Sequence, residues 1–224
     1  MMRELRYTLI CDGSSDTVLM PILTWALRIN GITCAIHPEW ADLRGFCKTL
    51  EEKIRRSIKY YPCDILFVHR DAEKESPEKR VAEIENALKK IHQLPVPPSV
   101  CVIPIRMQEA WLLFDERAIR HAADNRNGTM PLNLRRLDKI EDITDPKAVL
   151  YELLKTASGL TGRRLKKFRP EQKARHITEF MEDFSPLRRL SAFMAFEKNL
   201  RQVIQEQLTP PNVTLAVARK AFSI

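Results

Sequence analysis

The chain has 224 residues, of which 44% are hydrophobic and 29% are charged, as in an ordinary globular protein. It contains no run of about 18 apolar residues, and the apolar run near its start is too short for a secretory signal. We therefore expect a cytoplasmic protein with no membrane partner. The five cysteines form no CxxC pair and the five histidines are scattered, which excludes a zinc site of standard spacing.

The charge is distributed unevenly along the chain. Residues 1–112 contain 16 Lys/Arg and 15 Asp/Glu, a net charge of +1. Residues 113–224 contain 21 and 14, a net charge of +7. A basic second half is typical of a protein that meets a polyanion such as nucleic acid. A basic surface that contacts only solvent has the same composition, so charge alone leaves both interpretations open.

Strand and helix signals alternate over the first half of the chain. The predicted strands are 5–11, 32–36, 64–68 and 100–105. The predicted helices between and after them are 16–30, 46–60, 77–92 and 108–123. Because the connections are short and the two kinds of element alternate, the pattern predicts an α/β fold with a mostly parallel sheet covered on both faces.

The pattern changes after the loop signal Asn125-Arg126-Asn127-Gly128. From there the sequence predicts helices without strands, over residues 145–157, 170–182 and 186–207. We therefore expect two regions. Residues 1–124 form the α/β unit, and residues 125–224 form a basic helical extension that packs on it.

Acidic residues follow three of the four predicted strands. Asp12 follows the first strand, with Asp16 one helical turn later; Asp71 and Glu73 follow the third, and Glu109 follows the fourth. Parallel strands present their carboxyl ends at one edge of a sheet, so these side chains are expected to converge there. Crowded carboxylates repel one another unless cations neutralise them, and an all-oxygen ligand set suits Mg²⁺ or Mn²⁺.

Four of these acids also have a simpler interpretation. Asp71 and Glu73 could belong to a solvent-exposed approach to the next helix, although the apolar strand just before them argues against it. Asp16 could stabilise the first turn of a helix through the helix dipole. Glu109 could pair with Arg106, three residues earlier, with or without a metal.

The acidic motifs resemble those of the Toprim domain. Asp12-Gly13-Ser14-Ser15-Asp16 is similar to the signature Glu-Gly-x-x-Asp, with Asp12 in place of Glu. Asp71-Ala72-Glu73 is similar to the signature Asp-x-Asp, with Glu73 in the second place. The segments 109–115 and 184–193 resemble parts of a Toprim-like bacterial family of unknown function.

The resemblance implies a Toprim/Rossmann-like sheet and a nuclease that cleaves DNA or RNA with Mg²⁺ or Mn²⁺, as in overcoming-lysogenisation-type nucleases. Asp12 and Asp16 would hold one metal ion, Asp71 and Glu73 a second, and Glu109 would complete the cluster. The resemblance also implies a role in anti-phage defence beside a separate ABC- or AAA-type ATPase subunit. The alternative is a non-catalytic adaptor that binds nucleic acid or an ATPase and keeps a degenerate metal site.

The densest basic run lies in the second half of the chain. Its cationic side chains are candidate phosphate contacts: Arg163, Arg164, Lys166, Lys167 and Arg169. The competing interpretation is a solvent-exposed loop between helices.

Other phosphate chemistries are excluded by missing motifs. His69-Arg70-Asp71 matches the start of a kinase catalytic loop, but no glycine-rich loop, Asp-Phe-Gly or correctly spaced Asn accompanies it. The chain also lacks GxxxxGK[ST], which excludes a P-loop nucleotide hydrolase.

Overall fold

The computed structural model describes residues 4–92 and 94–208. Its sheet has four strands, all parallel, in the order β2-β1-β3-β4. The strands are β1 (Glu4–Ile10), β2 (Ala35–Trp40), β3 (Ile65–His69) and β4 (Ser99–Val102). This arrangement confirms the predicted α/β class and the parallel sheet.

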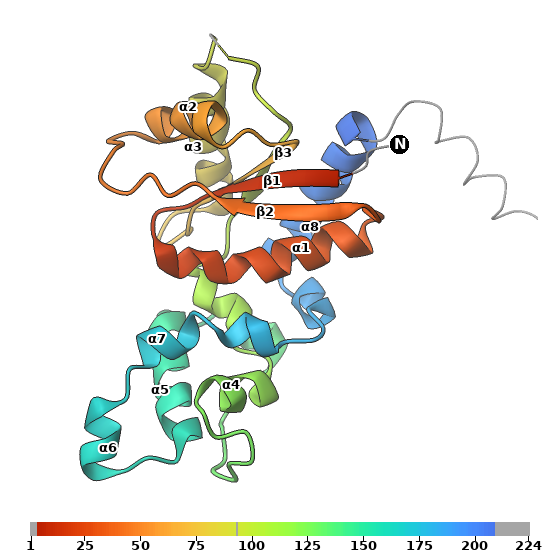
Figure 1. Ribbon diagram of the computed structural model, residues 1–224. Helices are drawn as coiled ribbons and strands as arrows, with labels where there is room; N and C mark the ends of the chain where they lie inside the picture. Colours follow the sequence, from red (N-terminus) through yellow and green to blue (C-terminus); the bar gives the residue numbers. More distant parts are fainter. Residues whose placement is uncertain (1–3, 93, 209–224) are drawn as a thin grey trace, which may run out of the picture.

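Helices cover both faces of the sheet (Figure 1). One face is covered by α1 (Met20–Ile29) and α8 (Ser191–Val203), and the other by α2 (Leu50–Tyr60) and α3 (Pro77–Lys89). The remaining helices are η1 (Ser14–Leu19), η2 (Gln108–Leu112), α4 (Glu116–Ala122), η3 (Leu137–Lys139), α5 (Pro146–Ser158), α6 (Gly162–Lys167), α7 (Pro170–Ala174), η4 (Ile177–Phe180), η5 (Ser185–Arg189) and the π-helical turn η6 (Ile204–Leu208). None of the helices within the described ranges is long and apolar enough to cross a membrane.

The side chains of β3 divide between two hydrophobic cores. Ile65 and Phe67 face the core beneath α1 and α8, whereas Leu66 and Val68 face the core beneath α2 and α3. All four are fully buried, because successive residues of a strand point to opposite faces and both faces are covered. This double burial explains the continuous apolar run in the sequence.

The helical extension shares a core with the sheet. The ring centroid of Phe196 on α8 lies 6.2 Å from that of Phe67 in β3. The ring centroid of Phe193, on the same helix, lies 5.2 Å from that of Trp111 in η2. One continuous cluster of buried residues joins β1, β3 and β4 to α5 and α8. Helix α8 of the predicted extension therefore packs on the sheet, and residues 209–224 of the predicted extension lie outside the described residues.

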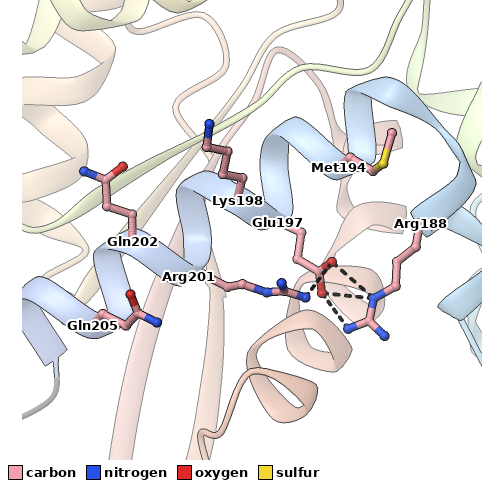
Figure 2. Close-up of a pocket in the computed structure, with 7 residues that line it drawn as sticks. All are labelled: Arg188, Met194, Glu197, Lys198, Arg201, Gln202 and Gln205. Carbon is pink, nitrogen blue, oxygen red and sulfur yellow. Dashed lines mark hydrogen bonds and ion pairs between the residues drawn. The ribbon is translucent and has the colours of Figure 1, made fainter. Parts of the chain in front are cut away.

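A buried carboxylate fixes α8 relative to α1. Glu197 is 5% exposed and accepts hydrogen bonds from Arg188 at 2.7 Å and from Asn30, at the end of α1, at 3.2 Å. Arg201 adds an ion pair at 3.1 Å. Figure 2 shows both arginines converging on this carboxylate. Two cations and one amide thus compensate the charge that α8 carries into the interface.

Several element predictions were wrong in their boundaries or continuity. The predicted strand 100–105 ends at Val102, the predicted helix 46–60 begins at Leu50, and the predicted helix 186–207 is divided at Leu190. The second strand begins three residues later than predicted and includes Pro38, which an edge strand tolerates because one of its sides needs no hydrogen bonds. The predicted helix 108–123 is divided, because the Asp115 side chain accepts from Ala118 N and starts a new helix there. The predicted helix 170–182 ends at Ala174, and a 3₁₀ helix follows after a short turn.

Truncating Phe196 to alanine should destabilise the protein strongly. The side chain is 2% exposed and packs against aromatic rings on both the sheet and η2, so its loss leaves a cavity. We expect Phe196→Ala to lower the free energy of unfolding by about 3–5 kcal/mol in urea titrations. The matched control is Met194→Ala on the same helix, where the side chain is 52% exposed and the expected change is within about 0.5 kcal/mol. Equal effects of the two variants would contradict the packing of α8 on the sheet.

Candidate active site

The acidic residues lie at the point where the strand order reverses. From β1 the chain goes to β2 on one side and then crosses to β3 on the other, which opens a crevice beyond the carboxyl ends of β1 and β3. A cavity of about 360 Å³ occupies this place. All five predicted site residues line it: Asp12, Asp16, Asp71, Glu73 and Glu109. Their roles as ligands or catalysts stay predictions.

Asp16 organises the loop that follows β1. Its Oδ2 accepts the backbone N–H groups of Asp12 at 3.1 Å and Gly13 at 3.0 Å. Its Oδ1 accepts the Ser15 hydroxyl at 2.8 Å and the side-chain amide of Gln108 at 2.9 Å. A carboxylate offers about four acceptor positions, and all four are used here. A ligand could therefore bind Asp16 directly only by displacing one of these hydrogen bonds.

Gln108 joins two of the acidic loops, and the sequence analysis missed it. Its side-chain amide donates to Asp16, and its backbone N–H donates to Asp71 Oδ1 at 2.8 Å. The side chain is 3% exposed, and its carbonyl oxygen has no hydrogen-bond partner within the described part of the chain. A buried carbonyl without a donor is costly, so this atom favours the approach of a cation or a proton donor.

Asp71 follows the buried strand β3. Burial raises its pKa from 3.8 to about 7, the charge of Asp16 adds to the rise, and the hydrogen bond from Gln108 N opposes it. Oδ2 of this carboxylate accepts no hydrogen bond from the residues that the structure describes. Asp71 thus has a free oxygen and a strong tendency to take up a positive charge.

Glu109 is the second buried acid of the cavity. It is 6% exposed, and burial raises its pKa, although the Lys147 ammonium, 3.9 Å from Oε1, acts in the opposite direction. Arg106, the alternative partner considered from the sequence, instead donates to the carbonyl oxygen of Glu73 at 3.2 Å. A single distant cation therefore compensates Glu109 incompletely.

The remaining two acids are exposed and paired. The side chains of Asp12 and Glu73 are each 66% exposed. Lys53 and Arg70 approach Asp12 at 2.8 and 3.7 Å, and Arg80 approaches Glu73 at 3.5 Å. Partial burial acts to raise the pKa of Asp12, but the hydrogen bond and charge of Lys53 outweigh it and lower that pKa. Lys53 lies on α2, Arg80 on α3 and Arg70 directly after β3, and none of these basic partners was identified from the sequence.

The loops that follow β3 and β4 are paired with each other. Glu73 and Arg106 both have left-handed backbones, with φ of 54° and 63°. Glu73 N donates to Arg106 O at 2.9 Å, while the Arg106 guanidinium donates back to Glu73 O. Ala72 N also donates to Pro104 O at 3.1 Å, so the two segments remain paired beyond the ends of their strands. Residues other than glycine adopt such backbones at a cost, which often marks functional loops.

The cavity does not contain a ready-made ligand set. Within residues 4–92 and 94–208, no three His, Cys, Asp or Glu side chains are placed so that they could hold a metal ion together. A divalent ion bound here would have to keep water ligands, as Mg²⁺ usually does, or draw the carboxylates closer together.

The predicted basic run lies away from the cavity. Its residues Arg163, Arg164, Lys166 and Lys167 are exposed on α6, a helix that the sequence did not predict, and Arg169 follows it. Lys147, at the start of α5, lines the cavity, whereas α6 follows the other end of α5 (Figure 1). The 13 residues of α5, which span about 20 Å, thus lie between Lys147 and α6 in the chain.

A larger hollow of about 630 Å³ lies along α8 (Figure 2). Its principal buried charge, Glu197, is already paired with Arg188 and Arg201. No buried donor or acceptor that lines it lacks a hydrogen bond among the described residues. The smaller acidic cavity, with incompletely compensated Asp71 and Glu109, is therefore the better candidate for chemistry.

Removing the Asp71 charge should stabilise the protein at high pH. The folded pKa of about 7 lies above the ordinary value of 3.8, so the favourable contribution is complete below pH about 4 and lost as pH rises through 7. The full difference between these two pKa values corresponds to at most about 4 kcal/mol of unfolding free energy. Because the side chain is 30% exposed, solvent screening makes the expected effect smaller. We expect Asp71→Asn to be about 1–2 kcal/mol more stable than the wild type at pH 8, with the gain shrinking towards pH 4. The measurement is urea unfolding in EDTA.

Asp12→Asn is the matched control for this pH dependence. The pKa of Asp12 is lowered in the folded state, so its favourable contribution is present above pH about 4 and lost at lower pH. This variant should gain no stability at pH 8. A gain equal to that of Asp71→Asn would mean that general charge repulsion, rather than burial of Asp71, is responsible.

Comparison with protein-family models, curated proteins and solved structures finds no match to this chain. The Toprim resemblance therefore rests on the short sequence motifs alone, and the assignment of function depends on the geometry of the cavity.

Proposed function

We propose that this protein is a divalent-metal-dependent nuclease that cleaves phosphodiesters of DNA or RNA. The observation that carries the proposal is the pair of incompletely compensated carboxylates, the buried Glu109 and the half-buried Asp71, in the crevice where the strand order reverses. A carboxylate shielded from water, with a raised pKa, destabilises the folded protein unless a cation or a proton neutralises it. In the Toprim resemblance, such acids serve Mg²⁺ or Mn²⁺.

The donor set fits a hard divalent cation. Asp71 Oδ2 and Glu109 have the fewest internal partners, and the orphaned carbonyl oxygen of Gln108 adds a neutral oxygen at the same cavity. Asp12 and Glu73 are accessible but would have to share their charge with Lys53 and Arg80. We therefore assign Asp71 and Glu109 the leading ligand roles, with the other predicted acids in support.

A bound Mg²⁺ or Mn²⁺ would supply Lewis acidity towards a phosphodiester and a water activated for attack. The residues of this chain do the rest. Asp16 and Gln108 hold the loops in place through hydrogen bonds, and Arg70 and Lys147 place positive charge beside the cavity for the phosphate backbone. The proposal extends, through the resemblance alone, to anti-phage defence beside an ATPase subunit.

The basic helix α6 defines a second contact with the substrate. It is separated in the chain from the cavity residue Lys147 by α5, whose 13 residues span about 20 Å. A duplex rises about 3.4 Å per base pair, so this length corresponds to roughly six base pairs. A nucleic acid bound at the cavity and extended along α5 would bring its backbone to Arg163, Arg164, Lys166 and Lys167.

A second candidate function is a non-catalytic adaptor that binds nucleic acid or an ATPase. The absence of a ready-made metal ligand set from the described residues favours it, as do the ion pairs that already occupy Asp12 and Glu73. An adaptor need not bind Mg²⁺ or Mn²⁺ at millimolar concentration, so metal titration separates the two functions.

Neutralising either Asp71 or Glu109 should abolish cleavage without unfolding the protein. We expect Asp71→Asn and Glu109→Gln to remain folded, to bind nucleic acid as the wild type does, and to lose metal affinity and cleavage at least about tenfold, because a charged oxygen ligand is lost. The assay uses DNA, tRNA and other RNA with Mn²⁺. Glu152→Gln, an exposed acid on α5 paired with Lys155, is the matched control. Undiminished cleavage in both site variants would place the chemistry elsewhere, and a wild type without metal binding or cleavage would favour the adaptor.

Reversing the charge of α6 should weaken nucleic-acid binding and its salt dependence. The quadruple change of Arg163, Arg164, Lys166 and Lys167 to Glu removes four candidate phosphate contacts. Each lost contact should reduce the slope of log affinity against log salt by about 0.7–0.9. The control reverses four exposed cations on α2 and α3, namely Arg55, Lys59, Lys89 and Lys90. If both quadruple variants behave alike, α6 makes no specific contact.

A further inference from the structure

His69 is a buried histidine whose ring borders the acidic cavity. It is the last residue of β3 and is 3% exposed. Its Nδ1 lies 3.0 Å from the carbonyl oxygen of Val102 in β4. A carbonyl oxygen can only accept a hydrogen bond, so Nδ1 carries the ring hydrogen. A neutral imidazole has one ring hydrogen, so in the neutral ring Nε2 is unprotonated.

The unprotonated nitrogen faces an acid of the cavity. Nε2 of His69 lies 3.5 Å from Oδ1 of Asp71. Two acceptor atoms this close repel each other unless a proton or a cation lies between them. Ligands about 2.1 Å from one metal ion are typically about 3–3.5 Å apart, so this pair has a spacing that a single ion could bridge.

The hydrogen bond to Val102 also has the form found around metal-bound histidines. Such histidines commonly donate their other ring N–H to a backbone carbonyl, which fixes the tautomer and directs the free nitrogen at the metal. Here the acceptor belongs to the neighbouring strand of the sheet, so the ring is held between β3 and β4. Neither of the acidic motifs includes this residue.

We propose that Nε2 of His69 is a ligand of the metal ion that binds in the cavity. We also propose that this nitrogen makes the site prefer a first-row transition ion such as Mn²⁺ over Mg²⁺. The inference rests on the proposed metal site and adds the identity of the ion. Imidazole nitrogen binds transition ions well, whereas Mg²⁺ prefers oxygen throughout. A site made of carboxylates and one imidazole should therefore bind both ions, but Mn²⁺ more tightly.

Pulsed electron paramagnetic resonance of wild-type protein with Mn²⁺ tests the ligand directly. We expect a ¹⁴N coupling that changes to a ¹⁵N pattern when histidine is labelled with ¹⁵N. In competition titrations, His69→Gln should lose this coupling, and its preference for Mn²⁺ over Mg²⁺ should fall at least about tenfold. The matched control is His176→Gln, which replaces an exposed histidine paired with Glu179. It should leave both readouts unchanged.

The outcomes separate this inference from the proposed function. Absence of any divalent-ion binding by the wild type at millimolar concentration would overturn both. Binding without a histidine coupling would overturn the nitrogen ligand alone and would assign the His69–Asp71 contact to a shared proton. Coupling that persists in His69→Gln would also overturn it. Thermal unfolding checks that His69→Gln is folded, and the wild-type spectrum remains decisive if it is not.

Discussion

The buried amide of Gln108 is the contact on which the geometry of the cavity depends. Its side chain binds the carboxylate that shapes the loop after β1, and its backbone N–H binds the carboxylate that follows β3. Gln108 itself lies after β4, so one residue connects the ends of three strands. Without it, repulsion between Asp16 and Asp71 would act unopposed across the crevice. The acids can therefore lie close together because a neutral donor holds them in place.

The acids of the cavity are compensated to very different degrees. Asp16 has all its acceptor positions filled, and Asp12 has two cations nearby, whereas the half-buried Asp71 and the buried Glu109 have few compensating partners. A cavity used solely for structure would be expected to compensate its buried charges first. The compensation here goes to the exposed and loop-forming acids instead, an imbalance that fits a site prepared for an external cation.

The sequence predicted the elements that periodicity specifies, and with them the placement of the acids. The buried run of β3 is apolar because both faces of the sheet are covered, and Asp71 follows it directly. Long-range polar contacts could not be predicted in this way. Gln108 meets Asp16 across 92 residues of sequence, and His69 reaches the neighbouring strand through its ring. Local sequence spacing does not predict such pairs, because they depend on the spatial order of the strands in the sheet. The signal that was available for Gln108 was a polar residue at the start of a largely apolar segment.

The reciprocal bonding of Glu73 and Arg106 has a consequence for motion in this protein. Each residue holds the other in a left-handed backbone, and the loops after β3 and β4 share hydrogen bonds along their length. Neither loop can relax alone without breaking the contacts that support the other. The two should fluctuate as one rigid flap, with Asp71 and Glu109 travelling together. Opening of the crevice to admit a large polymer would then have to break the hydrogen bond from Gln108 to Asp16 on the β1 loop, while leaving the spacing of Asp71 and Glu109 unchanged.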